Sequence, residues 1–128
     1  MKIVLDTNVL VSALINPEGL PAKILNLVLN GKLTVLYDNR IIGEYRAVLI
    51  RKKFGFSSEM IEPLLDFIEC EGDFVASEPL KLHFADEDDK KFLEVAESGN
   101  AEYLITGNIK HFPIEDNIVT PSIFLGEK

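Results

Sequence analysis

The feature that most constrains this chain is the alternation of short, wholly apolar segments with longer segments of helical periodicity. Five segments have the length and composition of strands: residues 2–5, 33–37, 74–76, 103–106 and 117–120. Four segments between them have apolar residues at helical spacing: 21–29, 39–51, 57–70 and 88–98. Strands that are apolar throughout and alternate with helices form parallel sheets covered on both faces. The sequence therefore predicts a three-layer α/β/α fold.

The size and composition of the chain limit its class. With 128 residues there is room for one hydrophobic core, so we expect a single domain over 1–128. The apolar runs are too short to cross a membrane, and a lone cysteine, Cys70, suits a reducing compartment. We therefore expect a cytoplasmic protein with no membrane contact. The net charge of −8 suits a protein that gathers carboxylates around a cation, but it suits an ordinary acidic protein equally well.

Polar residues follow two of the expected strands at the point where each strand ends. Asp6 comes directly after the first strand, and Thr106, Gly107 and Asn108 end and follow the fourth. In open parallel sheets, ligands bind beyond the carboxyl ends of the strands. Asp6 and Asn108 are therefore expected at one edge of the sheet.

Glu44 lies in the second expected helix, on the same face as the apolar residues Ile41 and Val48. A carboxylate that faces a core is costly unless it is paired, hydrogen-bonded or bound to a metal. Glu44 can therefore bind a metal, or it can form a salt bridge to Arg40 or Arg51. It can also lie at the edge of the apolar stripe, where the cost of burial is small.

Four consecutive acidic residues lie at the start of the last expected helix. Acidic side chains in a first turn complement the helix dipole, which accounts for Glu87 and Asp88, and Asp86 can serve as an N-cap. Asp89 differs, because apolar residues follow it three, four and seven positions later and it extends their stripe.

Asp6, Glu44 and Asp89 come from three different elements and can point into one pocket. Converging carboxylates without a basic partner nearby in the sequence are what a hard, oxygen-seeking cation requires. The residues themselves therefore predict a divalent-cation site at the carboxyl edge of the sheet.

Three stretches of the sequence resemble PIN domains, in order and in register. MKIVLDTNVLVSALI resembles the opening of that family, in which the first strand ends in a metal-binding Asp followed by Thr or Ser and Asn. EYRAVLIRKKF resembles the helix of the second acid, and DEDDKKFLEVAESGNAEYLITGNIKHF resembles the third-acid helix, the next strand and its turn. The chain is most similar to the toxin-like branch, the toxins of toxin–antitoxin pairs.

This resemblance implies a five-stranded parallel sheet in the order 3-2-1-4-5 and endonucleolytic cleavage of single-stranded RNA with Mg²⁺ or Mn²⁺. By position, Asp6, Glu44 and Asp89 become metal ligands, and with Asn108 they form the catalytic set. Asp86 is a further candidate ligand, because the acidic cluster leaves the register open by about one residue.

Four more residues are expected to contact the substrate or support the site: Asn8, Thr106, Arg51 and Lys110. Asn8 and Asn108 also have a simpler interpretation as the first residue of a helix or turn. The family often has Asp where this chain has Asn108, and an amide oxygen brings no charge, so we expect a second ion to be held weakly. Further basic residues lie in the acid-bearing elements, and about half of them are expected to face solvent only: Arg40, Arg46, Lys52, Lys53, Lys90 and Lys91.

The resemblance also implies partners besides RNA: a small antitoxin-like protein and a second copy of the chain in a homodimer. An apolar patch near the N-terminal helices is expected to serve such contacts. Its candidate residues are Ile15, Leu20, Ile24, Leu27 and Val28.

Two rival functions remain. A metal-dependent phosphohydrolase fits less well, because a dehalogenase-type phosphatase would have Asp-x-Asp where this chain has Asp6, Thr7 and Asn8. A PIN fold with a weakened site, acting as a binding module in RNA processing, is favoured by Asn108 and by the net charge.

Overall fold

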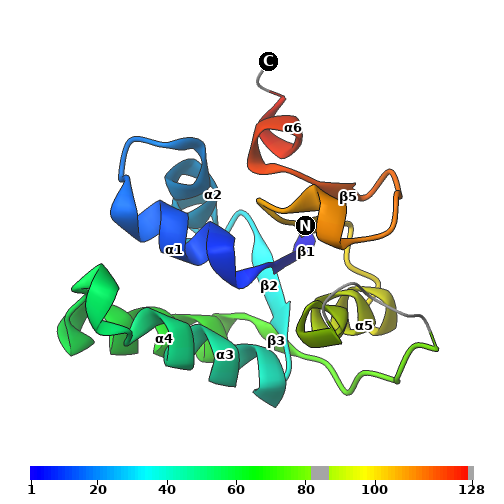
Figure 1. Ribbon diagram of the computed structural model, residues 1–128, viewed down its shortest axis with the longest axis horizontal. Coiled ribbons are helices and arrows are strands. Elements are labelled where there is room, and N and C mark those ends of the chain that lie inside the picture. Colours follow the sequence, from blue (N-terminus) through cyan, green and yellow to red (C-terminus); the bar gives the residue numbers. More distant parts are fainter. Residues whose placement is uncertain (82–86, 127–128) are drawn as a thin grey trace.

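A computed structural model describes residues 1–81 and 87–126, and its elements follow the expected alternation of strands and helices (Figure 1). The strands are β1 (Lys2–Leu5), β2 (Thr34–Tyr37), β3 (Asp73–Phe74), β4 (Tyr103–Ile105) and β5 (Ile118–Val119). The α-helices are α1 (Thr7–Ile15), α2 (Leu20–Leu29), α3 (Asn39–Leu49), α4 (Ser58–Glu71), α5 (Lys90–Ser98) and α6 (Pro121–Leu125). Short 3-10 helices are η1 (Lys52–Phe54), η2 (Glu87–Asp89) and η3 (Ile109–His111).

The five strands form one parallel sheet in the order β3-β2-β1-β4-β5, which confirms the expected topology. β1 lies at its centre, with Ile3 beside Val35 of β2 and Leu5 beside Ile105 of β4. Ile3, Val4 and Leu5 are buried because helices cover both faces of this strand. In Figure 1, α1 to α4 lie to the left of the sheet and α5 lies to its right. The sheet is therefore the middle of three layers.

Two helices were not expected from the pattern of apolar residues. The sequence of α1, TNVLVSALI, is apolar on nearly every side, so it has no clear helical period. It is nevertheless a helix, packed against α2 and α3. α6 is five residues long, which is too short for a helical period to show in the sequence. Thr120 is its N-cap residue, and the Thr120 side chain accepts a hydrogen bond from the Ile123 N–H.

Some expected boundaries and surfaces differ from the structure. α5 begins at Lys90, because residues 87–89 form η2. The expected apolar patch is partly buried: Ile24 and Val28 belong to the core, whereas Ile15 is exposed and Leu20 and Leu27 are half-buried. No helix in the described part of the chain is long and apolar enough to cross a membrane.

Candidate functional site

Asp6 lies where β1 ends and α1 begins, at the carboxyl edge of the sheet. Its side chain is buried, with 6% of the residue surface exposed. Although Asp6 is the N-cap residue of α1, its carboxylate does not cap the helix. The carboxylate accepts hydrogen bonds at Oδ2 from the Thr106 hydroxyl (2.8 Å) and from the Asn8 amide (3.4 Å). The side chain is therefore held between the end of β4 and the first turn of α1.

The turn after β4 is joined to Asp6 by two polar side chains. Thr106 is fully buried, and its Oγ1, besides donating to Asp6, accepts the Asn108 N–H at 2.9 Å. The Asn8 amide oxygen accepts the Gly107 N–H at 3.1 Å. A Cβ atom on Gly107 would lie 3.3 Å from that same oxygen, so a side chain there would press on Asn8. Thr106 and Asn8 thus support the site, and Asn108 is placed beside Asp6.

Glu44 is held next to Asp6 by its neighbour in α3. The buried Tyr45 hydroxyl donates to the Leu5 carbonyl at 2.6 Å, which ties α3 to the end of β1. Glu44 Oε2 accepts a hydrogen bond from the Thr7 hydroxyl, and Oε1 lies 2.7 Å from Lys91 Nζ. Glu44 therefore lies at the edge of the apolar stripe and forms an ion pair.

The partner in this ion pair differs from those considered from the sequence. Arg51 is exposed and makes no ion pair with another described residue, and Arg40 binds other carboxylates. Lys91 comes from α5, which contacts α3, and a contact between two helices far apart in the sequence leaves no local sequence pattern.

Asp89 precedes α5 and faces the same cavity as Asp6. Its side chain is 17% exposed, and its Oδ2 lies 3.1 Å from His111 Nδ1. Asp89 therefore lies at the margin of the core, beside η3, and lines the cavity. His111 was not expected at the site, because its only sequence signal is its position three residues after Asn108.

A cavity of about 360 Å³ brings these residues together. Its polar lining includes Asp6, Asn8, Asp89, Asn108 and His111, and Val11, Val48 and Phe54 form an apolar wall. Glu44 lies beside the lining, behind Thr7.

Burial, together with the charges of Asp89 and Glu44, raises the pKa of Asp6 from 3.8 to about 6, although hydrogen bonds from Thr106 and Thr7 oppose the shift. The structure thus gathers carboxylates around Asp6 at an electrostatic cost.

The donor atoms at this cavity suit a hard cation. Asp6 and Asp89 offer carboxylate oxygens and Asn108 offers an amide oxygen, and Asp6 has no cation partner among the described residues. Within 1–81 and 87–126, no three His, Cys, Asp or Glu side chains are grouped closely enough to hold a metal ion. Glu44 is paired with Lys91 in this arrangement.

Three expected site residues are not seen at the cavity for two different reasons. Asp86 lies outside the described residues, so its place is not described. Arg51 and Lys110 are exposed and do not belong to its lining. Phe54 and Lys91 were missed as site residues, because the sequence signals only a core-forming aromatic and one lysine among several.

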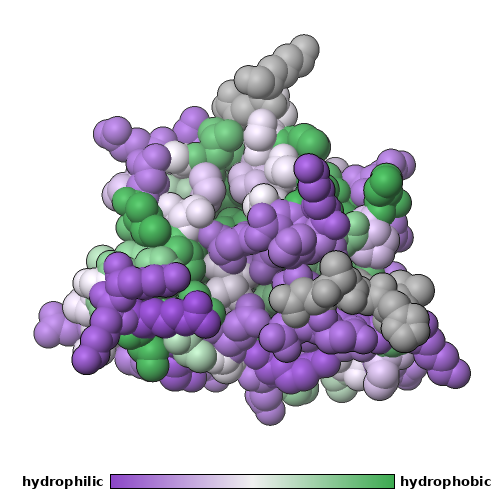
Figure 2. All heavy atoms as spheres, viewed as in Figure 1, coloured by the Kyte–Doolittle hydropathy of each residue, from purple (hydrophilic) through white to green (hydrophobic). Residues whose placement is uncertain are grey.

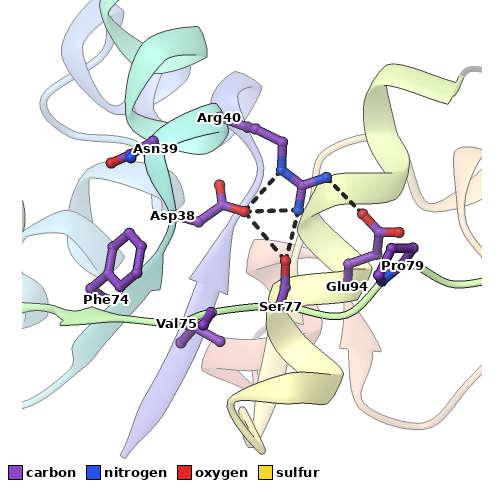
Figure 3. A pocket seen from close by; sticks show the side chains of 9 residues that line it. Asp38, Asn39, Arg40, Phe74, Val75, Ser77, Pro79 and Glu94 are labelled. Atoms are coloured by element: carbon purple, nitrogen blue, oxygen red, sulfur yellow. Dashed lines mark hydrogen bonds and ion pairs between the residues drawn. The ribbon is translucent and has the colours of Figure 1, made fainter.

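A second carboxylate cluster lies at the same edge of the sheet, after β2 (Figure 3). Arg40 donates from Nε to Asp38 Oδ2 (2.9 Å) and from Nη1 to Glu94 Oε1 (2.8 Å), and it also donates to the Ser77 hydroxyl. The Leu80 N–H donates a hydrogen bond to the other carboxylate oxygen of Glu94, Oε2, at 2.8 Å. These buried carboxylates are neutralised within the protein, unlike Asp6.

Comparison with known proteins agrees with this architecture. The family model described as PIN domain matches residues 2–110. A curated relative, the uncharacterised protein MJ1680 of Methanocaldococcus jannaschii, is 33% identical over 125 residues, which is 84% of this chain and 71% of the relative.

Proposed function

The chain belongs to the PIN-domain family, whose members are generally nucleases that use divalent metals, and we propose that it is a Mg²⁺- or Mn²⁺-dependent endoribonuclease acting on single-stranded RNA. The observation that carries the proposal is Asp6. It is a buried carboxylate at the carboxyl edge of a parallel sheet, with two other carboxylates nearby and no cation partner among the described residues. Such an arrangement is costly in a structural role and useful for binding a cation.

In this proposal, Asp6 and Asp89 hold the cation directly, Asn108 contributes its amide oxygen, and Glu44 completes the set when it leaves Lys91. A bound divalent ion would polarise a phosphate and lower the pKa of a water molecule. Thr106 and Asn8 fix the orientation of Asp6 through their hydrogen bonds. No Ser, Cys or His nucleophile is required.

The test is cleavage of an unstructured, end-labelled RNA by the purified chain. We expect cleavage with Mn²⁺ or Mg²⁺, none with EDTA, and a loss of at least about 100-fold in Asp6→Asn and Asp89→Asn. Asp38→Asn is the matched control, because Asp38 follows β2 as Asp6 follows β1 and is equally buried. It should remain active below its own melting temperature. Undiminished cleavage by Asp6→Asn, or in EDTA, would refute the proposal.

We further propose that the chain is the toxin of a toxin–antitoxin pair, with a small protein partner and a homodimeric state. The support is the similarity of its opening and acid-bearing stretches to the toxin-like branch. Expression in a bacterial host should arrest growth, and Asp6→Asn should relieve the arrest. Growth unaffected by the wild-type chain at the same expression level would contradict the toxin assignment, and strictly monomeric sedimentation would contradict the dimer.

A second candidate function is a binding module with a weakened catalytic site. Two observations favour it: Asn108 stands where a carboxylate is common in the family, and Lys91 already neutralises Glu44. RNA binding without cleavage under any divalent metal would select this function over the nuclease.

A further inference from the structure

The cavity beside Asp6 has an apolar wall that the proposed metal chemistry does not use. Val11, Val48 and Phe54 line it together with the carboxylates. The cavity volume of about 360 Å³ lies in the range of small-molecule binding sites. An aromatic ring that faces an acidic site is informative, because the solvated ion itself needs only oxygen atoms.

Phe54 is presented to this cavity by a tight turn after α3. Gly55 follows it with φ of 68°, and the Gly55 N–H bonds the Lys52 carbonyl at 3.1 Å. This left-handed conformation suits glycine and turns the chain back on itself. As a result the Phe56 ring stacks on Phe54, with centroids 5.6 Å apart and planes at 13°.

The two rings have different surroundings. Phe56 packs against the hydrophobic core, whereas Phe54 does not belong to that packed set and is only half-buried. Phe56, packed against the core, thus supports the Phe54 ring by stacking on it. A supported ring that is only half-buried is a surface on which a flat group can stack.

Three consecutive cations precede this ring: Arg51, Lys52 and Lys53. All three are exposed, and none makes an ion pair with another described residue. Lys53 Nζ lies 5.1 Å from the centroid of the Phe54 ring, a contact that is weak at an exposed site. Figure 2 shows hydrophilic side chains gathered where α3 ends and α4 begins. Unpaired cations in a chain of net charge −8 suit a polyanion.

We propose that Phe54 is a stacking platform for one nucleobase of single-stranded RNA, next to the proposed catalytic site at Asp6. Arg51, Lys52 and Lys53 bind phosphates of the same strand. This inference rests on the proposed function and names the substrate contact within it. The base displaces Lys53 from the ring, and the lysine turns to a phosphate. Stacking tolerates any base, and it requires an unpaired one, so the platform accounts for a preference for single strands.

The test measures RNA binding in EDTA, where no cleavage occurs. A single-stranded oligoribonucleotide carries 2-aminopurine at successive positions, and its fluorescence reports stacking. We expect quenching at one position with the wild-type chain, at least about 5-fold weaker binding in Phe54→Ala and in Phe54→Leu, and recovery in Phe54→Tyr. Phe74→Ala is the matched control, because Phe74 is an exposed aromatic that lines the Arg40 pocket instead.

A second measurement addresses the cations independently of the ring. Replacing Arg51, Lys52 and Lys53 by glutamine should flatten the dependence of log Kd on log salt by about 2, since each lost phosphate contact removes about 0.7 for single strands. Phe54→Ala and the triple glutamine variant should keep the wild-type melting temperature to within a few degrees. This control separates a loss of RNA binding from a loss of folding.

The outcomes distinguish this inference from the proposed function. If the wild-type chain cleaves RNA and Phe54→Ala binds RNA as tightly as the wild-type chain does, the stacking platform is overturned and the nuclease proposal stands. Absence of cleavage under every metal, with quenching that depends on Phe54, would support the platform and overturn the nuclease. Full binding by Phe54→Leu would also overturn the platform, because leucine retains apolar contact but cannot stack.

Discussion

Two aspartates at the same edge of the sheet occupy equivalent places and have opposite surroundings. Asp6 follows β1 and precedes α1, and Asp38 follows β2 and precedes α3. Both are buried, with 6% and 7% of their surface exposed. Asp38 caps its helix by accepting the Ile41 N–H at 3.0 Å, and its other oxygen binds Arg40. Asp6 does neither.

The difference teaches how to separate a structural carboxylate from a functional one. Burial alone would raise the pKa of Glu94, but the hydrogen bonds from Arg40 and the Leu80 N–H, with the charges of Arg40 and Lys90, lower it overall. At Asp6 burial prevails and the pKa rises to about 6. The carboxylates of Asp38 and Glu94 are neutralised by Arg40, a cation of the protein itself. Asp6 has no such partner among the described residues, so its site suits a cation that the protein does not supply.

The largest expected effect on stability comes from Asp6→Asn in EDTA. The folded-state pKa of Asp6 lies above its unfolded value of 3.8, so ionisation favours unfolding, and the penalty grows from pH 4 to pH 6 and is constant above. The substitution should therefore stabilise the metal-free protein by up to about 3 kcal/mol at pH 8 and by little at pH 4. Urea denaturation at both pH values measures this.

The sign should reverse when Mn²⁺ is present, because the wild-type carboxylate then gains a cation and the variant does not. If Asp6→Asn destabilises the metal-free protein at pH 8, Asp6 is a structural carboxylate like Asp38, and the comparison fails.

Arg40→Met should have the opposite effect. Removing the guanidinium leaves Asp38 and Glu94 buried without a cation, and we expect a loss of about 2–3 kcal/mol. That is less than for a fully buried pair, because the Arg40 side chain is 49% exposed. The low pKa of Glu94 makes this contribution available above pH 4.5, and it is lost as the pH falls further.

Arg46→Met is the control for Arg40→Met. Arg46 pairs with Glu62 on the surface, at 3.1 Å with both side chains over 40% exposed, so its loss should cost less than about 1 kcal/mol. Equal losses in the two variants, measured by urea denaturation, would mean that the Arg40 cluster is not the buried network described above.

Asn108→Asp should sharpen the contrast at the Asp6 site. Carboxylate charge is the main source of affinity for a hard cation, so the change should tighten Mn²⁺ binding by about 1–2 kcal/mol, with the gain limited by repulsion from Asp6 and Asp89 in the empty state. Calorimetric titration of both proteins measures it. Identical isotherms would place the residue 108 side chain outside the cation site.

The sequence placed β1, β2, β4 and β5 well, because wholly apolar strands are local signals. The third strand was expected at 74–76 but is β3 at Asp73–Phe74, where both residues are exposed. The order of the strands was implied by the family resemblance. Local signals failed for α1, which is apolar on nearly every side. That Asp6 and Asp89 line one cavity agrees with two local features of the sequence. Asp6 directly follows a strand, and Asp89 extends the apolar face of its helix. By contrast, the pairing of Glu44 with Lys91 joins two helices whose proximity depends on the whole fold.

Some missed features did leave a trace. Glu94 lies inside the apolar run FLEVA, and a carboxylate with apolar residues on both sides of it is expected to be buried and to need a cation as partner, which Arg40 supplies. Phe54 follows three basic residues and precedes Gly-Phe, a pattern compatible with a nucleic-acid contact. Without the turn geometry, however, that pattern does not distinguish a stacking platform from a core residue.

Among the substitutions at the two clusters, the smallest expected effect comes from Lys91→Met. It tests whether Lys91 neutralises Glu44 as Arg40 neutralises Asp38 and Glu94. The Lys91 and Glu44 side chains are 12% and 26% exposed, so their ion pair is only partly buried, and its loss should destabilise the metal-free protein by about 1 kcal/mol. The ammonium also competes with a cation for Glu44, so Mn²⁺ should bind the variant a few-fold more tightly. Lys90→Met is the control for the Mn²⁺ effect, since Lys90 is the neighbouring residue of α5, lies 4.0 Å from the exposed Glu87, and acts by its charge on Glu94 in the Arg40 cluster instead of on Glu44. Thermal denaturation with and without Mn²⁺ separates the two effects, which should have opposite signs in Lys91→Met. The change in Mn²⁺ binding should be absent in Lys90→Met. Weaker Mn²⁺ binding in Lys91→Met would show that Lys91 organises Glu44 for the cation instead of competing with it.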